Sequence, residues 1–375
     1  MKKRMMLWLL AGLVAVPFVV GQAFAEIRIG LMAPLTGSWA SEGRAMKQIV
    51  DLLADEVNEA GGVLGQKVVI IAEDDGGDPR TASLAAQRLS TQGIVAVIGT
   101  YGSSITEATQ NIYDENKIVQ VATGSTAIRL SEKGLQYFFR TSPRDDEQGL
   151  VAANTLKNIG FERIAILHDN TTYARGLADE AQALLQADEL DIVLFDALTP
   201  GERDYSAILS QLRSRNPDVV LFTGYFPEAG LLLRQKKNMG WDVPFLGGDA
   251  TNNPDLVSIA GTEAAEGFMF LSPPVPQDLD SAEAMSFMTA YREKYQGDPA
   301  SVWAVLAGDA FKVLVAAIEG TGSTEPDEIA EFLRTGLEDF QGLTGTIAFD
   351  DKGDRVGELY RLYHVDGEGN FVLQP

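Results

Sequence analysis

Short runs of apolar and β-branched residues alternate with helical runs along most of the chain. When strands are separated by helices of about 10–15 residues, consecutive strands run parallel and the helices cover both faces of the sheet. The predicted strands cover residues 27–32, 68–73, 94–98, 118–121, 164–168, 191–195, 219–223 and 245–247. The predicted helices cover residues 43–60, 82–91, 103–116, 146–158, 176–186, 205–215 and 227–239. This alternation predicts an α/β fold built on parallel sheets.

The number of strands predicts two doubly wound lobes rather than one. The chain has 375 residues, and single hydrophobic cores stop growing near about 250–300 residues. The proline-rich segment 273–276 is the clearest linker, because proline fixes φ and discourages helices and central strands. The pattern after it predicts helices at 279–296 and 302–319, and strands at 346–349 and 358–364 around a turn at 351–354.

The first 25 residues have the order of a secretory signal peptide. A basic start precedes an apolar run over residues 5–20, and Ala23-Phe24-Ala25 provides the small residues of a cleavage site. The alternative is an uncleaved membrane anchor, which the short apolar run disfavours. We therefore expect cleavage and export of a soluble protein to the periplasm. Because the chain has no cysteine, we expect no lipid anchor.

Composition excludes several classes of chemistry. The formal net charge of −23 argues against a nucleic-acid partner, because phosphate binding needs a basic face. The absence of cysteine excludes thiolate nucleophiles and cysteine-ligated metals. The two histidines, His168 and His364, lack an accompanying nucleophile and orienting group, so we predict no catalytic residue. Two acidic turns, 74–78 and 350–354, lack the spacing of a calcium loop, and we expect no metal and no cofactor.

Two loops rich in small hydroxylic residues follow predicted strands of the first half. They cover 99–104 and 122–126. Ligands of open α/β sheets bind beyond the carboxyl ends of the strands, and free N–H groups at a helix N-terminus suit an anion such as a carboxylate. The alternative is that Ser103 and Ser104 are ordinary helix caps. Neither loop has the spacing of a phosphate-binding motif.

Polar residues also follow strands of the second half. Tyr225 and Asp249 come directly after the predicted strands 219–223 and 245–247. The Asp249 carboxylate could pair with an ammonium group, although a turn residue beside two glycines is the alternative. Tyr173 lies in a loop after the strand 164–168, and loops of that kind are usually solvated.

Taken together, a series of short stretches makes the chain resemble the periplasmic leucine/isoleucine/valine-binding proteins. These are type I solute-binding proteins of ATP-driven (ABC) transport systems. The resemblance covers nearly the whole chain after residue 25, and its specificity comes from the order and spacing of the stretches. They are residues 32–37, 61–65, 74–79, 97–99, 140–142, 166–169, 224–225, 227–228 and 349–353.

The resemblance implies two α/β lobes that close on an amino acid by a hinge motion. The first lobe would take residues 26–143 and 277–355, and the second 144–272 and 356–375. Three crossings would join them, with a hinge that includes 273–276. The implied function is capture of an amino acid, aliphatic or branched-chain, and its delivery by a monomeric protein to an inner-membrane ABC permease.

The resemblance also implies a set of ligand-binding residues. Ser103 and Thr126 would bind the ligand carboxylate together with Tyr225. The Gly124 carbonyl and the Asp249 carboxylate would hold the ammonium group, and Tyr173 would cover the pocket. We further expect the remaining walls of the site to include Trp39, Tyr101, Gly102 and Ser125.

The chain departs from the family pattern mainly around the ligand's side chain. Glu42 stands where the leucine-binding members have an aromatic residue, Tyr101 where they have an aliphatic one, and Ser301 where they have phenylalanine. Asp249 replaces the usual glutamate and is one methylene shorter. The positions of a family disulfide carry Gly77 and Gly102, so both cysteines are missing together.

Three other functions remain open from the sequence. A ligand sensor has the same fold, and a binder of a different small carboxylate or amide would use a similar cleft. An enzyme would need a base, for which His168 is the only candidate near the cleft. Calorimetry against amino acids separates binding from these alternatives, and turnover of a bound ligand would indicate an enzyme.

Overall fold

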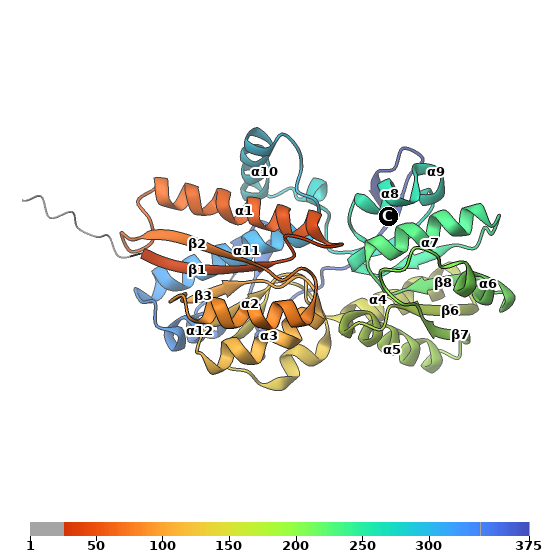
Figure 1. Cartoon of the computed structure of the whole chain (residues 1–375), viewed down its shortest axis with the longest axis horizontal. Coiled ribbons are helices and arrows are strands. Elements are labelled where there is room, and N and C mark those ends of the chain that lie inside the picture. Colours follow the sequence, from red (N-terminus) through yellow and green to blue (C-terminus); the bar gives the residue numbers. More distant parts are fainter. Residues whose placement is uncertain (1–25, 338, 375) are drawn as a thin grey trace, which may run out of the picture.

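The computed structural model describes residues 26–374 except residue 338, and it divides into two α/β lobes side by side (Figure 1). The predicted signal peptide, residues 1–25, lies outside the described residues. Within the described part, none of the helices combines the length and the hydropathy needed to cross a membrane.

The first lobe is built on a five-stranded sheet in the order β2-β1-β3-β4-β5, in which all pairs are parallel. Helices α1, α11 and α12 form one layer, and α2 and α3 pack together in the other. The strands are β1 (Glu26–Ala33), β2 (Lys67–Asp74), β3 (Ala96–Ile98), β4 (Val119–Ala122) and β5 (Phe138–Arg140). The helices are α1 (Ala40–Glu59), α2 (Pro79–Ser90), α3 (Ser103–Glu115), η1 (Ile128–Lys133), α10 (Ala282–Tyr295), α11 (Val302–Thr321) and α12 (Pro326–Thr335).

The second lobe has a seven-stranded sheet in the order β14-β13-β10-β9-β8-β6-β7. Helices α4 and α5 pack together, as do α7, α8 and α9. The strands are β6 (Arg163–His168), β7 (Asp191–Ala197), β8 (Val219–Phe222), β9 (Phe245–Gly247), β10 (Met269–Ser272), β13 (Arg361–Val365) and β14 (Phe371–Leu373). The helices are α4 (Asp145–Ile159), α5 (Thr172–Ala187), α6 (Ser206–Ser214), α7 (Phe226–Asn238), η2 (Asp249–Thr251), α8 (Asp255–Ala260) and α9 (Thr262–Ala265).

The C-terminal part differs from the prediction in two ways. Strands β13 and β14 run antiparallel to their neighbours, because no crossover helix precedes them. The predicted strands at 346–349 and 358–364 do not pair across the turn between them. Instead, β12 (Gly345–Ile347) pairs with β11 (Phe340–Gly342) in a separate hairpin, and β13 joins the second sheet.

Helix α11 shows how the core of the first lobe is built. Most of its residues are buried, because it lies between α1 and the sheet and meets α12 on a further side. The Ser301 hydroxyl caps its start by accepting from the Trp303 N–H, and Gly322 ends it with a φ of 67°, which glycine adopts without strain. The second lobe has one apolar cluster on each side of its sheet.

The order of elements takes the chain between the two sheets three times. It crosses between β5 and α4, between β10 and η3 (Pro276–Asp278), and between β12 and β13. The loops after β3 and β4 face the loops after β6, β8 and β9, and the Thr172 N–H donates to Ser104 Oγ across the gap at 3.0 Å. The boundary residues of the lobes and the hinge motion stay predictions.

Candidate functional site

Four aromatic side chains from the two lobes pack together where the strands end. Trp39 and Tyr101 belong to the first lobe, Tyr173 and Tyr225 to the second. The rings of Trp39 and Tyr225 are stacked with centroids 4.2 Å apart. The Tyr101 and Tyr173 rings meet Tyr225 edge-on at 5.9 and 5.4 Å. Because aromatic pairs stabilise by about 0.5–1.5 kcal/mol beyond area burial, this cluster favours a closed arrangement of the lobes.

The first lobe supplies hydrogen-bond donors beside this cluster. Ser103 is the first residue of α3, where backbone N–H groups have no intrahelical partner and the helix dipole is positive. The Ser103 hydroxyl accepts from the Ala127 N–H at 3.2 Å. Thr126 is fully buried, and neither its hydroxyl nor that of Tyr101 has a hydrogen-bond partner among the described residues. The arrangement suits an anion.

The loop after β4 is held in place by residues of the first lobe that pack against it. A Cβ at Gly124 would lie 2.6 Å from Cδ2 of Tyr101, so a larger residue would displace that ring. The Ser125 hydroxyl bonds to Thr106 Oγ1 at 2.6 Å and donates to the Tyr101 carbonyl at 3.2 Å, which occupies it within the first lobe. The Arg140 guanidinium donates to the carbonyls of Ser125 and Ala127 at 3.0 and 2.9 Å.

Two buried carboxyl groups complete the site, and the Asp145 N–H donates to the Thr126 carbonyl at 3.0 Å. Gln148 Nε2 donates to Asp145 Oδ1 at 3.0 Å and to Asp249 Oδ2 at 2.9 Å. The Tyr360 hydroxyl donates to Asp249 Oδ2 at 2.5 Å. Burial raises the pKa of both carboxyls, and the charge of Asp249 raises that of Asp145 further. Asp145 Oδ2 has no hydrogen-bond partner among the described residues. The charge of Arg140 lowers the pKa of Asp145 only in part, so the pair still offers a carboxylate oxygen to a cation.

Three residues of this carboxylate group were missed by the sequence reasoning. Asp145 begins α4, and acidic residues are common in a first helical turn. Its position shortly after β5 therefore did not mark it as a site residue. Gln148 follows one turn later on the same face of α4. Tyr360 arrives from the C-terminal segment before β13, and no local pattern predicts that approach. A signal for Asp145 existed, since β5 ends at the same sheet edge as β3 and β4.

Trp39 occupies the space between Gly77 and Gly102. A Cβ at Gly77 would lie 3.0 Å from Cε3 of Trp39, and one at Gly102 would lie 3.0 Å from its Cζ3. The indole ring therefore packs directly on both backbones. The two glycines make room for a ring that links their two segments without a covalent bond.

We expect Gly102→Ala to push Trp39 and Tyr225 apart. The new methyl group would also lie 3.3 Å from the Tyr225 hydroxyl, and overpacking of this kind costs about 1–3 kcal/mol. Thermal denaturation should show lower stability, and quenching of tryptophan fluorescence should change. The matched control is Gly176→Ala in α5, where nothing lies within 4 Å of the added Cβ and helix propensity favours alanine. Equal melting temperatures for the two variants would contradict the packing argument.

Glu42 joins the two lobes through buried hydrogen bonds. It is fully buried in the first turn of α1 and accepts hydrogen bonds from Asn253 Nδ2 of the second lobe and from Ser301 Oγ, both at 2.6 Å. Burial raises the pKa of Glu42 to about 7, although these two hydrogen bonds oppose the shift. Glu42 therefore contributes a buried polar contact to the closed arrangement.

The two histidines take part in local contacts. His168 ends β6, and its Nδ1 accepts from the Asn170 N–H at 3.1 Å. Burial lowers the pKa of His168, which keeps the ring neutral. His364 lies in β13 and contacts Gln374. Within the described ranges, no group of three or more histidine or acidic residues could hold a metal ion.

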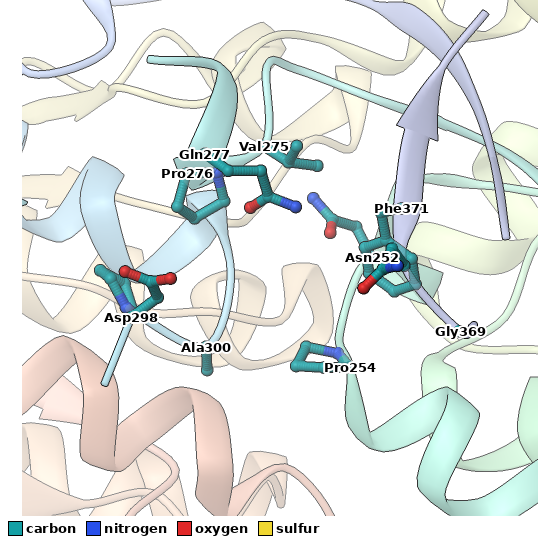
Figure 2. A pocket seen from close by; sticks show the side chains of 11 residues that line it. Asn252, Pro254, Val275, Pro276, Gln277, Asp298, Ala300, Gly369 and Phe371 are labelled. Carbon is teal, nitrogen blue, oxygen red and sulfur yellow. The ribbon is translucent and has the colours of Figure 1, made fainter. Parts of the chain in front are cut away.

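A cavity of about 250 Å³ lies beside the hinge segment (Figure 2). Asp298 and Ala300 of the first lobe face Pro254 of the second across it. Asp298 is paired with Arg292 at 2.5 Å, and the buried polar atoms that lack a partner in the described part of the chain lie elsewhere. The cavity therefore offers no unsatisfied buried group to a ligand.

Two doubly wound lobes with a polar site between the ends of their strands define a two-lobed binding protein. The chain belongs to the periplasmic binding protein family, whose pattern its residues 26–370 match. This match confirms the family and the two-lobed α/β fold that the sequence predicts. Members of the family are periplasmic binding proteins.

Similar proteins lie on the leucine/isoleucine/valine branch of the family. The Leu/Ile/Val-binding protein BraC3 of Rhizobium johnstonii is 37% identical over 344 residues, covering 91% of this chain and 92% of that protein. The leucine-binding protein LivK of Thermotoga maritima is 30% identical with a TM-score of 0.86, over 93% and 98% of the two chains. The structure of LivJ from Streptococcus pneumoniae, solved with isoleucine, is 28% identical with a TM-score of 0.85, over 93% and 100%.

Proposed function

We propose that this protein captures an α-amino acid, aliphatic or branched-chain, between its lobes. The observation that carries the proposal is the buried pair of Asp145 and Asp249, which offers a free carboxylate oxygen to a cation, together with the N-terminus of α3, which offers N–H groups to an anion. An α-amino acid supplies an ammonium group and a carboxylate to match both. The names of the similar proteins support the same ligand class.

The carboxylate of the ligand would bind at the start of α3. The Ser103 hydroxyl and N–H, the free Thr126 hydroxyl and the Tyr225 hydroxyl are its proposed partners. The ammonium would bind the Gly124 carbonyl, Asp145 and Asp249, and Tyr173 would cover it. The ligand's side chain would lie against Trp39 and Tyr101. Gly102, which packs on the Trp39 ring, and the segment around Ser125 would form the remaining walls.

We further propose that the closed protein delivers its ligand to an inner-membrane ABC permease. A cleaved signal peptide at residues 1–25 would export it to the periplasm as an unlipidated monomer. Binding and release of the ligand need no covalent reaction. His168 Nδ1 accepts a hydrogen bond from a backbone N–H.

The proposal is tested by titration calorimetry of the mature protein against the common amino acids and their deaminated analogues. We expect submicromolar to micromolar binding of at least one aliphatic amino acid, about −8 kcal/mol at 1 μM. The matching 2-oxo acid should bind far more weakly, because it brings no ammonium to the carboxylate pair. Equal binding of the two would instead indicate a binder of small carboxylates.

We also expect ligand binding to release protons in mildly acidic buffer. The pKa of both carboxyls is raised in the empty site, so lowering the pH protonates them before it protonates ordinary aspartates. An ammonium ligand favours the ionised forms, so affinity should fall as the pH decreases. Calorimetry at pH 5.5 and 8.0, in buffers of different ionisation enthalpy, measures both effects. A proton release that stays at zero at pH 5.5 would contradict this account.

A further inference from the structure

A separate cavity of about 240 Å³ lies outside the inner site and is formed by both lobes. Its walls include Trp39 and Gly77 of the first lobe, and Asp169, Tyr225 and Glu228 of the second. Trp39 and Tyr225 are the stacked pair of the inner site. Their rings therefore border both the inner site and this cavity, which we call the antechamber.

Asp169 brings an unsatisfied carboxylate oxygen to the antechamber. Its Oδ1 accepts from the Thr171 N–H at 3.0 Å, as in an ordinary turn. Its Oδ2 has no hydrogen-bond partner within residues 26–374 as described, although Asp169 is only 2% exposed. A buried carboxylate oxygen without a partner is unfavourable. The turn explains one oxygen of Asp169 and leaves the other free for a donor.

Glu228 adds a second carboxyl group. It lies in the first turn of α7, is 6% exposed, and accepts from the Gly201 N–H at 3.0 Å. Its charge raises the pKa of Asp169, which burial has already raised, to about 6. The residues that line the antechamber, all of them described, include no lysine, arginine or histidine. Two buried acids thus share a cavity without a compensating cation.

The aromatic walls favour an organic cation. The faces of tryptophan and tyrosine attract ammonium groups by about 0.5–2 kcal/mol. A metal ion would need more oxygen ligands, and no group of three acidic or histidine residues that could hold one occurs in the described part of the chain. Two carboxyls and two aromatic rings together suit a primary ammonium group.

We propose that the antechamber is a second binding subsite, which takes a protonated primary amine between Asp169, Glu228 and the Trp39–Tyr225 rings. The amine is either a free small molecule or the distal ammonium of an amino acid held in the inner site. The second case rests on the proposed function. Because both lobes form the walls, an amine bound here stabilises the closed arrangement.

The test compares the affinities for L-ornithine and L-norvaline, which has the same carbon chain without the distal amine. It also measures propylammonium binding, both alone and in the presence of saturating norvaline. The variant is Asp169→Asn, which keeps a carbonyl oxygen for the Thr171 turn and removes the charge. Glu202→Gln, an exposed acid near the antechamber, is the matched control for long-range charge effects. Glu228→Gln provides a second variant should Asp169→Asn fail to fold, as judged by circular dichroism.

If the distal amine is the occupant, wild type binds ornithine more tightly than norvaline, and Asp169→Asn removes about a tenfold preference while norvaline affinity stays unchanged. If a free amine is the occupant, propylammonium binds beside norvaline and loses about tenfold in the variant. Either result supports the subsite when Glu202→Gln has no effect. Ornithine no tighter than norvaline, together with no propylammonium binding, overturns it. If the proposed function is wrong, norvaline does not bind to wild type. Binding of propylammonium alone can still be measured in that case, so the two failures can be told apart.

Discussion

Replacing Asp249 by asparagine should nearly abolish amino-acid binding and leave the fold intact. Asparagine keeps one oxygen for the hydrogen bond from Tyr360, removes the negative charge and replaces the other oxygen by an NH2 group. Loss of one partner from a buried charged hydrogen bond costs about 2–5 kcal/mol, or roughly 30-fold or more in affinity. Titration calorimetry with the best amino acid from the panel measures the loss.

The stability of Asp249→Asn should move in the opposite direction. Burial raises the pKa of Asp249 above its value in the unfolded chain. The ionised group therefore destabilises the folded protein at and above neutral pH, and this cost is lost as the pH falls from the raised pKa of about 7 toward the ordinary aspartate value. The free energy of unfolding of the variant should equal or exceed that of wild type. The control is Asp242→Asn, an exposed acid of the same lobe, which should change neither quantity. Unchanged affinity in Asp249→Asn would disprove the ammonium assignment.

The fold was largely predictable because local patterns decide parallel α/β units. Period-two and period-3.6 apolar runs locate most strands and helices of both lobes. Strands β5, β10, β11 and β14, of three or four residues each, were not predicted. The antiparallel end of the second sheet depends on the crossing after β12, a tertiary event that no local run encodes.

The site was partly predictable for the same reason. Ser103, Thr126, Tyr225 and Asp249 follow strands directly, and strand ends in one sheet share an edge. The structure brings them together with Tyr173, Trp39 and Tyr101. Their contacts with a ligand stay a proposal.

Other features of the site depend on side-chain direction or on distant segments. Ser125 is in the predicted loop, yet its hydroxyl turns into the lobe toward Thr106. Tyr360 reaches Asp249 across 111 positions of sequence. Strand and helix patterns contain no information about either contact, so the sequence alone could not predict them.

The largest loss of stability should follow from Arg140→Leu. Arg140 is fully buried, and its Nε pairs with Asp354 Oδ1 at 2.5 Å. Burial alone would raise the pKa of Asp354, but Arg140 and Arg144 lower it, so the ion pair stabilises the fold above the ordinary aspartate pKa and is lost in strong acid. Removing one member of a buried pair costs about 3–5 kcal/mol. Thermal and urea denaturation of the variant should show this loss, whereas Arg292→Leu, at an exposed ion pair, should cost less than about 1 kcal/mol.

Arg140→Lys separates the stabilising role of this residue from its role in the site. A lysine keeps a positive charge for Asp354, but its single ammonium cannot also reach the carbonyls of Ser125 and Ala127, which the arginine fork bonds from behind. These two carbonyls flank Thr126. Stability should therefore recover in part, while amino-acid affinity should stay below wild type because the loop that presents the Thr126 hydroxyl is no longer fixed. Full recovery of affinity in Arg140→Lys would mean that Arg140 supports the fold alone and does not position the site.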